Sequence, residues 1–238
     1  MGVFSIIRVS GSFLMIDYNN KEVLKNALDD MEKAGVKFVH FDVMDGKFVE
    51  KKTFDHTLVK WVQENTSLML DIHLMVQNPE KVVRDYVQIG PDIITVHYEA
   101  TNLDKLEDTL KYIKSKTILA GVAINPETPA YKLKELIKKN LVDVVVVMGV
   151  KPGAGGQTFI PGSAEKVAEI RDMDKNVYIE VDGGVNTKNA RILRKLGANI
   201  LVSGSHLFSS KNMKKTVTTL CGKDWGNRIK QFFSKNID

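Results

Sequence analysis

The sequence predicts an α/β fold, namely a single (β/α)8 TIM barrel with a C-terminal helical extension. Apolar strand-like runs alternate with amphipathic helical stretches, and eight such pairs follow one another along the chain. Because one helix separates each strand from the next, a parallel sheet with right-handed crossovers is expected. Eight pairs in 238 residues match this barrel, which typically has about 250 residues. An open doubly wound sheet is the alternative, but it would concentrate polar residues at one switch point, whereas here they end nearly every strand.

The expected elements follow in order. Strands are predicted at residues 5–12, 37–42, 68–74, 92–97, 117–123, 142–148, 177–182 and 199–203. Helices are predicted at residues 20–34, 55–63, 79–88, 103–114, 128–138, 162–172, 187–195 and 212–221. Gly35, Gly90 and Gly197 are expected to cap helices, because glycine readily adopts the left-handed conformation there. The Asn-Pro pairs at 78–79 and 125–126 are expected to open helices, since proline suits a first helical turn.

Residues 1–238 are interpreted as one domain, because no linker or low-complexity segment divides them. Residues 222–238 are expected to form a basic amphipathic helical tail. Its apolar residues Ile229, Phe232 and Phe233 would pack on the barrel exterior.

Charge and cysteine content narrow the range of partners. The net charge is +5, but residues from Lys211 onward hold seven Lys/Arg and two Asp/Glu, which leaves 27 against 27 in the rest. We therefore expect a neutral barrel body, with no nucleic-acid or membrane partner, and leave a homo-oligomer open. One cysteine, Cys221, excludes an intramolecular disulfide framework. With no recognisable secretory signal at the N-terminus, a cytoplasmic location is expected.

The stretch Phe38 to Gly46, F-V-H-F-D-V-M-D-G, contains the first candidate site residues. In a strand of period two, His40 and Asp42 point to the same face. That face should be buried, and buried ionisable groups must be paired or metal-bound. His73 and Asp182 end two later strands.

The carboxyl ends of barrel strands converge, so strand-end residues should meet at one place. These candidates are Ser12, His40, Asp42, His73, His97, Met148 and Asp182. Two His and two Asp would make a four-ligand site for one divalent ion, of which zinc, iron, manganese or cobalt suits these ligands better than calcium. The ion's identity stays open, because the same ligands accept several metals.

Glycine-rich segments follow the last three predicted strands and indicate a phosphate-bearing ligand. They are Lys151–Gln157, Asp182–Gly184 and Ser203–Ser205. Their glycines permit conformations that turn amide N–H groups toward an anion. Loops after the seventh and eighth strands, with a short helix beyond, form the usual phosphate site of such barrels.

Four motifs together resemble the ribulose-phosphate 3-epimerase family. They are His40-Phe-Asp-Val-Met-Asp-Gly46, Asp71-Ile-His-Leu-Met-Val76, Pro152-Gly-Ala-Gly-Gly-Gln157 and Glu180-Val-Asp-Gly-Gly184, and the resemblance covers roughly residues 8 to 210. It implies a metal-dependent 3-epimerase that interconverts D-ribulose 5-phosphate and D-xylulose 5-phosphate through a metal-stabilised enediolate. By the same resemblance, His40, Asp42, His73 and Asp182 hold the metal, and Asp42 and Asp182 are the catalytic acid/base pair on opposite faces of the substrate. The implied substrate-binding residues are Ser12, His73, Met44, Met75, Met148, Gly153, Ala154, Gly155, Gly156, Gly183, Gly184, Gly204 and Ser205.

The chain departs from the family pattern near the predicted site. Gly11 replaces Pro, Ala154 replaces an aromatic residue, Met-Ile replaces Ser-Ala at 15–16, and Lys47-Phe-Val-Glu-Lys51 replaces His-Phe-Val-Pro-Asn. These changes leave open a D-allulose 6-phosphate (hexulose-phosphate) 3-epimerase, in which Lys47 or Lys51 would reach the sugar. A non-catalytic phosphosugar-binding barrel is the alternative of another class, and the intact set of His and Asp argues against it.

Overall fold

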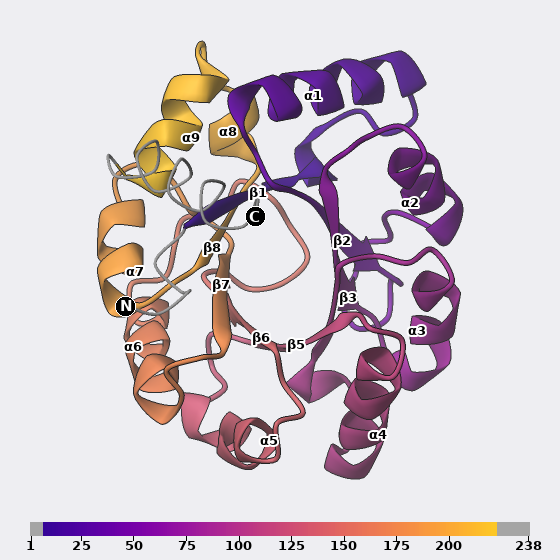
Figure 1. Cartoon of the computed structure of the whole chain (residues 1–238), viewed down its shortest axis with the longest axis vertical. Helices are drawn as coiled ribbons and strands as arrows, with labels where there is room; N and C mark the ends of the chain where they lie inside the picture. The colour runs from indigo at the N-terminus through magenta and orange to yellow at the C-terminus, as the bar shows by residue number, and fades with distance from the viewer. Residues whose placement is uncertain (1–6, 223–238) are drawn as a thin grey trace, which may run out of the picture.

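A computed structural model of the chain describes residues 7–222, which form a closed barrel of eight parallel strands surrounded by helices (Figure 1). The strands are β1 Arg8–Ser12, β2 Phe38–Met44, β3 Met69–Met75, β4 Ile93–His97, β5 Leu119–Ile124, β6 Val144–Met148, β7 Tyr178–Asp182 and β8 Ile200–Ser203. Each strand pairs with the next, and β8 pairs in parallel with β1 to close the barrel. The predicted (β/α)8 fold is therefore confirmed, and the open sheet is excluded.

The helices lie outside the barrel and follow the strands in sequence order. They are α1 Lys21–Ala34, α2 His56–Gln63, α3 Pro79–Val87, α4 Leu103–Lys114, α5 Lys134–Lys138, α6 Ser163–Met173, α7 Ala190–Leu196, α8 Ser205–Phe208 and α9 Met213–Cys221. Short 3-10 helices are η2 Phe13–Met15, η3 Tyr98–Ala100 and η4 Ala130–Leu133. Helix α1 shows the local logic: the Asn20 side chain caps its first amides, and Gly35 ends it in the left-handed conformation with φ of 84°.

The interior of the barrel divides into an apolar end and a polar end. Phe38, Ile93, Val144 and Ile200 pack together where the strands begin. Nearer the strand ends, the interior also contains polar and charged side chains, among them histidines and acids that are buried. Because such groups are costly to bury without partners, this polar end is where a functional site is expected.

The element boundaries differ from the prediction at several places, and three of these differences have a clear local cause. Strand β2 continues past Asp42 to Met44, because Val43 and Met44 still pair with β3. Asn125-Pro126 forms a turn, closed by the Thr128 amide on the Asn125 carbonyl at 3.0 Å, and helical structure begins only at Ala130. Helix α7 begins at Ala190 instead of 187, since the Asn186 side chain accepts the amides of Lys188 and Asn189 in a turn.

Part of the prediction lies outside the described residues. This holds for the expected first residues of strand 5–12 and for the basic helical tail beyond Gly222, including Ile229, Phe232 and Phe233. Among residues 7–222, no helix has the length and apolar character that crossing a membrane requires.

Candidate active site

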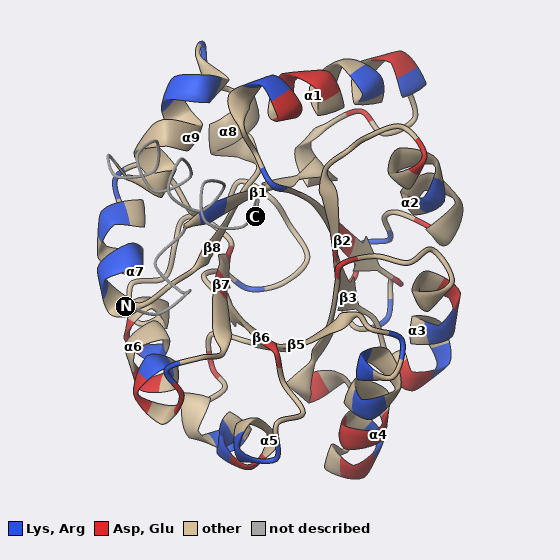
Figure 2. Cartoon of the chain, viewed as in Figure 1, with Lys and Arg blue, Asp and Glu red and all other residues tan. Residues whose placement is uncertain are grey.

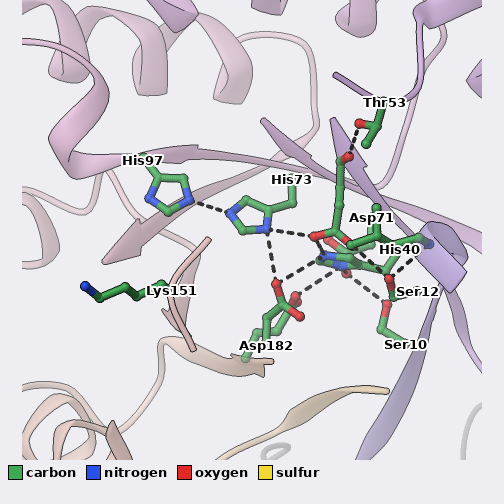
Figure 3. Close-up of polar contacts among 12 residues, drawn as sticks. Ser10, Ser12, His40, Thr53, Asp71, His73, His97, Lys151 and Asp182 are labelled. Atoms are coloured by element: carbon green, nitrogen blue, oxygen red, sulfur yellow. Dashed lines mark hydrogen bonds and ion pairs between the residues drawn. The ribbon is translucent and has the colours of Figure 1, made fainter. Parts of the chain in front are cut away.

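Four side chains from three strands meet at the carboxyl end of the barrel (Figure 3). His40 and Asp42 come from β2, His73 from β3 and Asp182 from β7, and one ligand atom of each lies within 4.8 Å of the others. The His40 Nε2 atom is 3.4 Å from Asp42 Oδ1 and 3.7 Å from Asp182 Oδ2. The His73 Nδ1 atom is 3.7 Å and 3.4 Å from the same two oxygens. The structure thus brings together the four residues proposed as metal ligands.

The nitrogen atoms that face this cluster lack hydrogen-bond partners. His40 Nε2 and His73 Nδ1 are both fully buried and unpaired, although carboxylate oxygens surround them. Burying a polar atom without a partner is costly, whereas a divalent ion would bind both nitrogens and both carboxylates. The donor set, two imidazoles and two carboxylates, therefore fits a divalent transition metal.

Mutual electrostatics shift the protonation of these groups. Burial lowers the pKa of His40, but the carboxylates of Asp71 and Asp42 outweigh burial and raise the pKa well above its ordinary value. Burial raises the pKa of Asp42, but His40 outweighs it and holds this pKa well below its ordinary value. Asp42 is therefore ionised at neutral pH.

Outer residues orient the cluster from behind. The Asp71 Oδ2 atom lies 2.7 Å from His40 Nδ1 and accepts the Ser10 hydroxyl at 2.9 Å. In the neutral imidazole that a metal would bind, with the proton of His40 on Nδ1 facing Asp71, the Nε2 lone pair faces the cluster. The Ser12 hydroxyl donates to Asp42 Oδ2 at 2.7 Å, which leaves Oδ1 directed at the histidines.

His97 and Glu99 form a second line of contacts behind the cluster. The Nε2 atom of His97 lies 2.9 Å from His73 Nε2, and its Nδ1 atom lies 3.2 Å from Glu99 Oε2. Burial lowers the pKa of His97 to about 4, so this imidazole is neutral at pH 7. From the sequence, His97 is a strand-end candidate without an assigned role, and Glu99 is not among the candidates. The His-Tyr-Glu sequence at residues 97–99 could have indicated Glu99, because it places a carboxylate two residues after a strand-end histidine.

A cavity of about 490 Å³ opens above the cluster, and Asp42 and Asp182 both line it. Most of the predicted substrate-binding residues line the same cavity. These are Ser12, Met44, Met75, Met148, Gly153, Ala154, Gly155, Gly156, Gly183, Gly184, Gly204 and Ser205. His73 is the exception: it is fully buried in the cluster and does not line the cavity.

The cavity wall also contains residues that are not among the candidates predicted from the sequence. Lys188 and His206 also line it, beyond β7 and in α8 respectively. The Nε2 atom of His206 accepts the Thr187 amide at 3.3 Å, which joins the two loops. Helix α8 is only four residues long, too short for a periodic signal to mark His206 in advance.

The loop after β2 is closed on itself instead of reaching into the cavity. Asp45 forms an antiparallel bridge with Lys52, and Asp45 Oδ1 accepts the amides of Lys47 and Phe48 at 2.8 and 2.9 Å. Lys47 and Lys51 are exposed, and neither lines the cavity, so the hypothesis that they contact the sugar gains no support. Phe48 instead packs on the His97 ring, with 4.7 Å between the ring centroids.

Comparison with known proteins agrees with the geometry. The model of the Ribulose-phosphate 3 epimerase family matches residues 8–208. The chain is 37% identical over 222 residues to ribulose-phosphate 3-epimerase of Bacillus subtilis (strain 168), covering 91% of this chain and 99% of that protein. It is 38% identical over 217 residues to the chloroplastic ribulose-5-phosphate-3-epimerase of Arabidopsis thaliana, covering 90% and 75%. The solved KGPDC structure from Streptococcus mutans has a TM-score of 0.69 at 14% identity, covers 94% of this chain and 99% of that chain, and shows similarity of fold alone.

Proposed function

Because this chain belongs to the ribulose-phosphate 3-epimerase family, we propose that it interconverts D-ribulose 5-phosphate and D-xylulose 5-phosphate by proton transfer at C3. The observation that carries the proposal is the pair of carboxylates, Asp42 and Asp182, that line one cavity beside two buried histidines. Relatives that are 35–38% identical to this chain are named ribulose-phosphate 3-epimerases, which favours the pentulose over a hexulose 6-phosphate. The protein is accordingly an isomerase, and the non-catalytic reading has no support.

The two carboxylates divide the proton work between them. One removes the C3 proton from one face of the substrate while the other delivers a proton to the opposite face, which inverts the carbon. The hydrogen bond from Ser12 and the adjacent His40 stabilise ionised Asp42, which suits it to act as the base in one direction. In the reverse direction Asp182 removes the proton and Asp42 delivers one.

His40, Asp42, His73 and Asp182 would hold the divalent ion, with zinc, iron, manganese or cobalt as the proposed metals. When bound, the ion supplies positive charge next to the substrate oxygens, where negative charge develops as the proton leaves. The chain's own contribution is to place both carboxylates and both imidazoles around one point. Ser12 and Asp71 fix the orientation of two of these four groups.

Apolar and glycine residues of the cavity complete the proposed substrate site. Met44, Met75 and Met148 are each at most 2% exposed and line the cavity beside the carboxylates. They exclude water and add no competing acid. We assign the phosphate to the glycine segments beyond β6, β7 and β8, where amide groups and Lys188 border the cavity.

The proposed partner is a small sugar phosphate in the cytoplasm. Figure 2 shows Lys and Arg spread over the outer helices, with Asp and Glu beside them on α1 and α4. This mixed surface does not favour a nucleic-acid or membrane partner for the barrel body.

Substitution of Asp182 tests the proposal. Asp182→Asn should lower kcat for epimerisation at least about 100-fold, since an amide cannot deliver the proton. The variant should remain folded and still bind inorganic phosphate. Asp172→Asn is the control, because the Asp172 side chain, in α6, is 82% exposed and forms an ion pair with Lys175 just beyond the end of that helix. Near-normal turnover in Asp182→Asn would remove Asp182 from the acid/base role.

A further inference from the structure

His97 contacts His73 at its Nε2 atom, Glu99 contacts His97, and neither His97 nor Glu99 lines the cavity. His97 ends β4, and Glu99 follows in η3, which turns its carboxylate back toward the His97 ring. Both His73 and His97 are fully buried. We propose that His97 and Glu99 are positioning residues that hold His73 in the tautomer with its proton on Nε2, so that the Nδ1 lone pair faces Asp42 and Asp182.

Glu99, His97 and His73 form a chain of hydrogen bonds, which we call the relay. The order of donors and acceptors along the relay follows from the chemistry of its members. A carboxylate only accepts hydrogen bonds, so His97 Nδ1, at 3.2 Å from Glu99 Oε2, must carry a proton. A neutral imidazole has one donor and one acceptor, which makes His97 Nε2 an acceptor. His73 Nε2, at 2.9 Å from that atom, must therefore donate. In neutral His73, the other nitrogen, Nδ1, is then left with a lone pair.

The relay opposes the preference that the nearby carboxylates would impose on His73. The oxygens of Asp42 and Asp182 lie 3.7 and 3.4 Å from His73 Nδ1, and by themselves they would favour a proton on that nitrogen. A proton there would occupy the direction in which a metal must bind. His40 is held by Asp71 directly, whereas His73 is held by Glu99 through His97. A carboxylate thus stands behind each histidine.

Glu99 is itself anchored firmly enough to serve this role. Its Oε1 atom accepts the Asn125 amide at 2.9 Å and the Thr128 hydroxyl. The Lys166 ammonium donates to the carbonyls of Asn125, Pro126 and Thr128, which fixes the turn that supplies these donors. Phe48 packs against the other partner, His97, and restrains its ring.

The isosteric substitution Glu99→Gln tests the direction of the relay. The Asn125 amide still needs an acceptor, so the Gln oxygen should stay with it and the Gln amide should face His97. That donor would force the proton of His97 onto Nε2 and the proton of His73 onto Nδ1. Zn²⁺ affinity, measured by competition with a chelator, should then fall about 10- to 100-fold. A purely space-filling role would tolerate this change.

Glu80→Gln is the matched control. The Glu80 side chain is 21% exposed against 22% for Glu99, and it also accepts from a threonine hydroxyl, but it contacts no proposed ligand. Its Zn²⁺ affinity should stay within twofold of the wild type, and both variants should melt within a few degrees of it. Equal Zn²⁺ affinity for Glu99→Gln and the wild type would overturn the proposal.

Nitrogen-15 NMR of histidine-labelled, Zn²⁺-loaded protein gives a second, independent readout. We expect the His97 proton on Nδ1 in the wild type and on Nε2 in Glu99→Gln. A wild-type His97 protonated on Nε2 would also overturn the proposal. The inference rests on the proposed function only through the ligand set, and neither readout uses epimerisation. A protein that binds Zn²⁺ through this relay but does not epimerise would refute the proposed function alone.

Discussion

Gly184, in the cavity wall after β7, packs closely against the backbone of Phe159. Replacing Gly184 with alanine, which adds one methyl group, tests this close packing. Gly184 has φ of +68°, and a Cβ atom there would lie 2.5 Å from the Phe159 nitrogen and 2.8 Å from its Cα. Both obstacles are backbone atoms, which cannot rotate away. Gly156, in the loop after β6, has a similar φ of +75°, but a Cβ atom there would meet nothing within 4 Å. Comparing alanine substitutions at Gly184 and Gly156 therefore separates the cost of backbone strain from the cost of crowding.

The expected magnitudes follow from these two geometries. Alanine in the left-handed region costs roughly 1–2 kcal/mol at either position. Crowding adds about 1–3 kcal/mol at Gly184 only. For a chain of this size, each kcal/mol lowers Tm by about 2–4 °C. Gly184→Ala should therefore melt about 6 °C below Gly156→Ala, which should itself melt about 4 °C below the wild type.

Differential scanning calorimetry of the three proteins at one pH and one metal concentration measures these differences. Gly162→Ala is a further control, because Gly162 has an ordinary φ of −60° and open space around its Cα. If Gly184→Ala and Gly156→Ala melted within 2 °C of each other, the close packing of Gly184 on Phe159 would be refuted.

Two further predictions concern the metal and the single thiol. Zn²⁺ at 100 times its dissociation constant should stabilise the protein by about 2.7 kcal/mol, which raises Tm by about 5–11 °C. His40→Gln should lose this shift in Tm. An equal shift in the wild type and the variant would contradict the assigned ligands. Burial raises the pKa of Cys221 to about 12, so at pH 8 its reaction with DTNB should be slower than that of an ordinary thiol by a factor on the order of a thousand. Because Cys221 is the only cysteine, rapid labelling of the native protein would show directly that its thiol is not shielded.

The proposed metal ligands could be predicted from sequence because they depend on regular strand geometry. Period two places His40 and Asp42 on one face of β2, and the register of a parallel barrel brings Asp42 opposite His73. The same rule predicts the position of the Asp182 side chain at the end of β7. These three strands converge through regular barrel geometry, so the site could be predicted without knowing any loop conformation.

The relay and the turn at Pro126 depend on irregular backbone, and periodicity does not describe it. Glu99 reaches His97 only because the chain curls into η3 immediately after β4. Proline fits both a first helical turn and a tight turn, so Asn125-Pro126 alone could not distinguish the two. The structure has a turn at this position, and in it the Asn125 amide donates a hydrogen bond to Glu99.

Proton NMR of the metal-loaded protein with D-ribulose 5-phosphate in D2O tests the central claim most directly. If Asp42 and Asp182 act from opposite faces, D-xylulose 5-phosphate should accumulate with solvent deuterium at C3, since the carboxylate that delivers the proton exchanges with solvent. Product that retains the original C3 proton would contradict the two-carboxylate mechanism. A substrate that keeps its C3 proton, with no product formed, would contradict the assignment of the reaction itself.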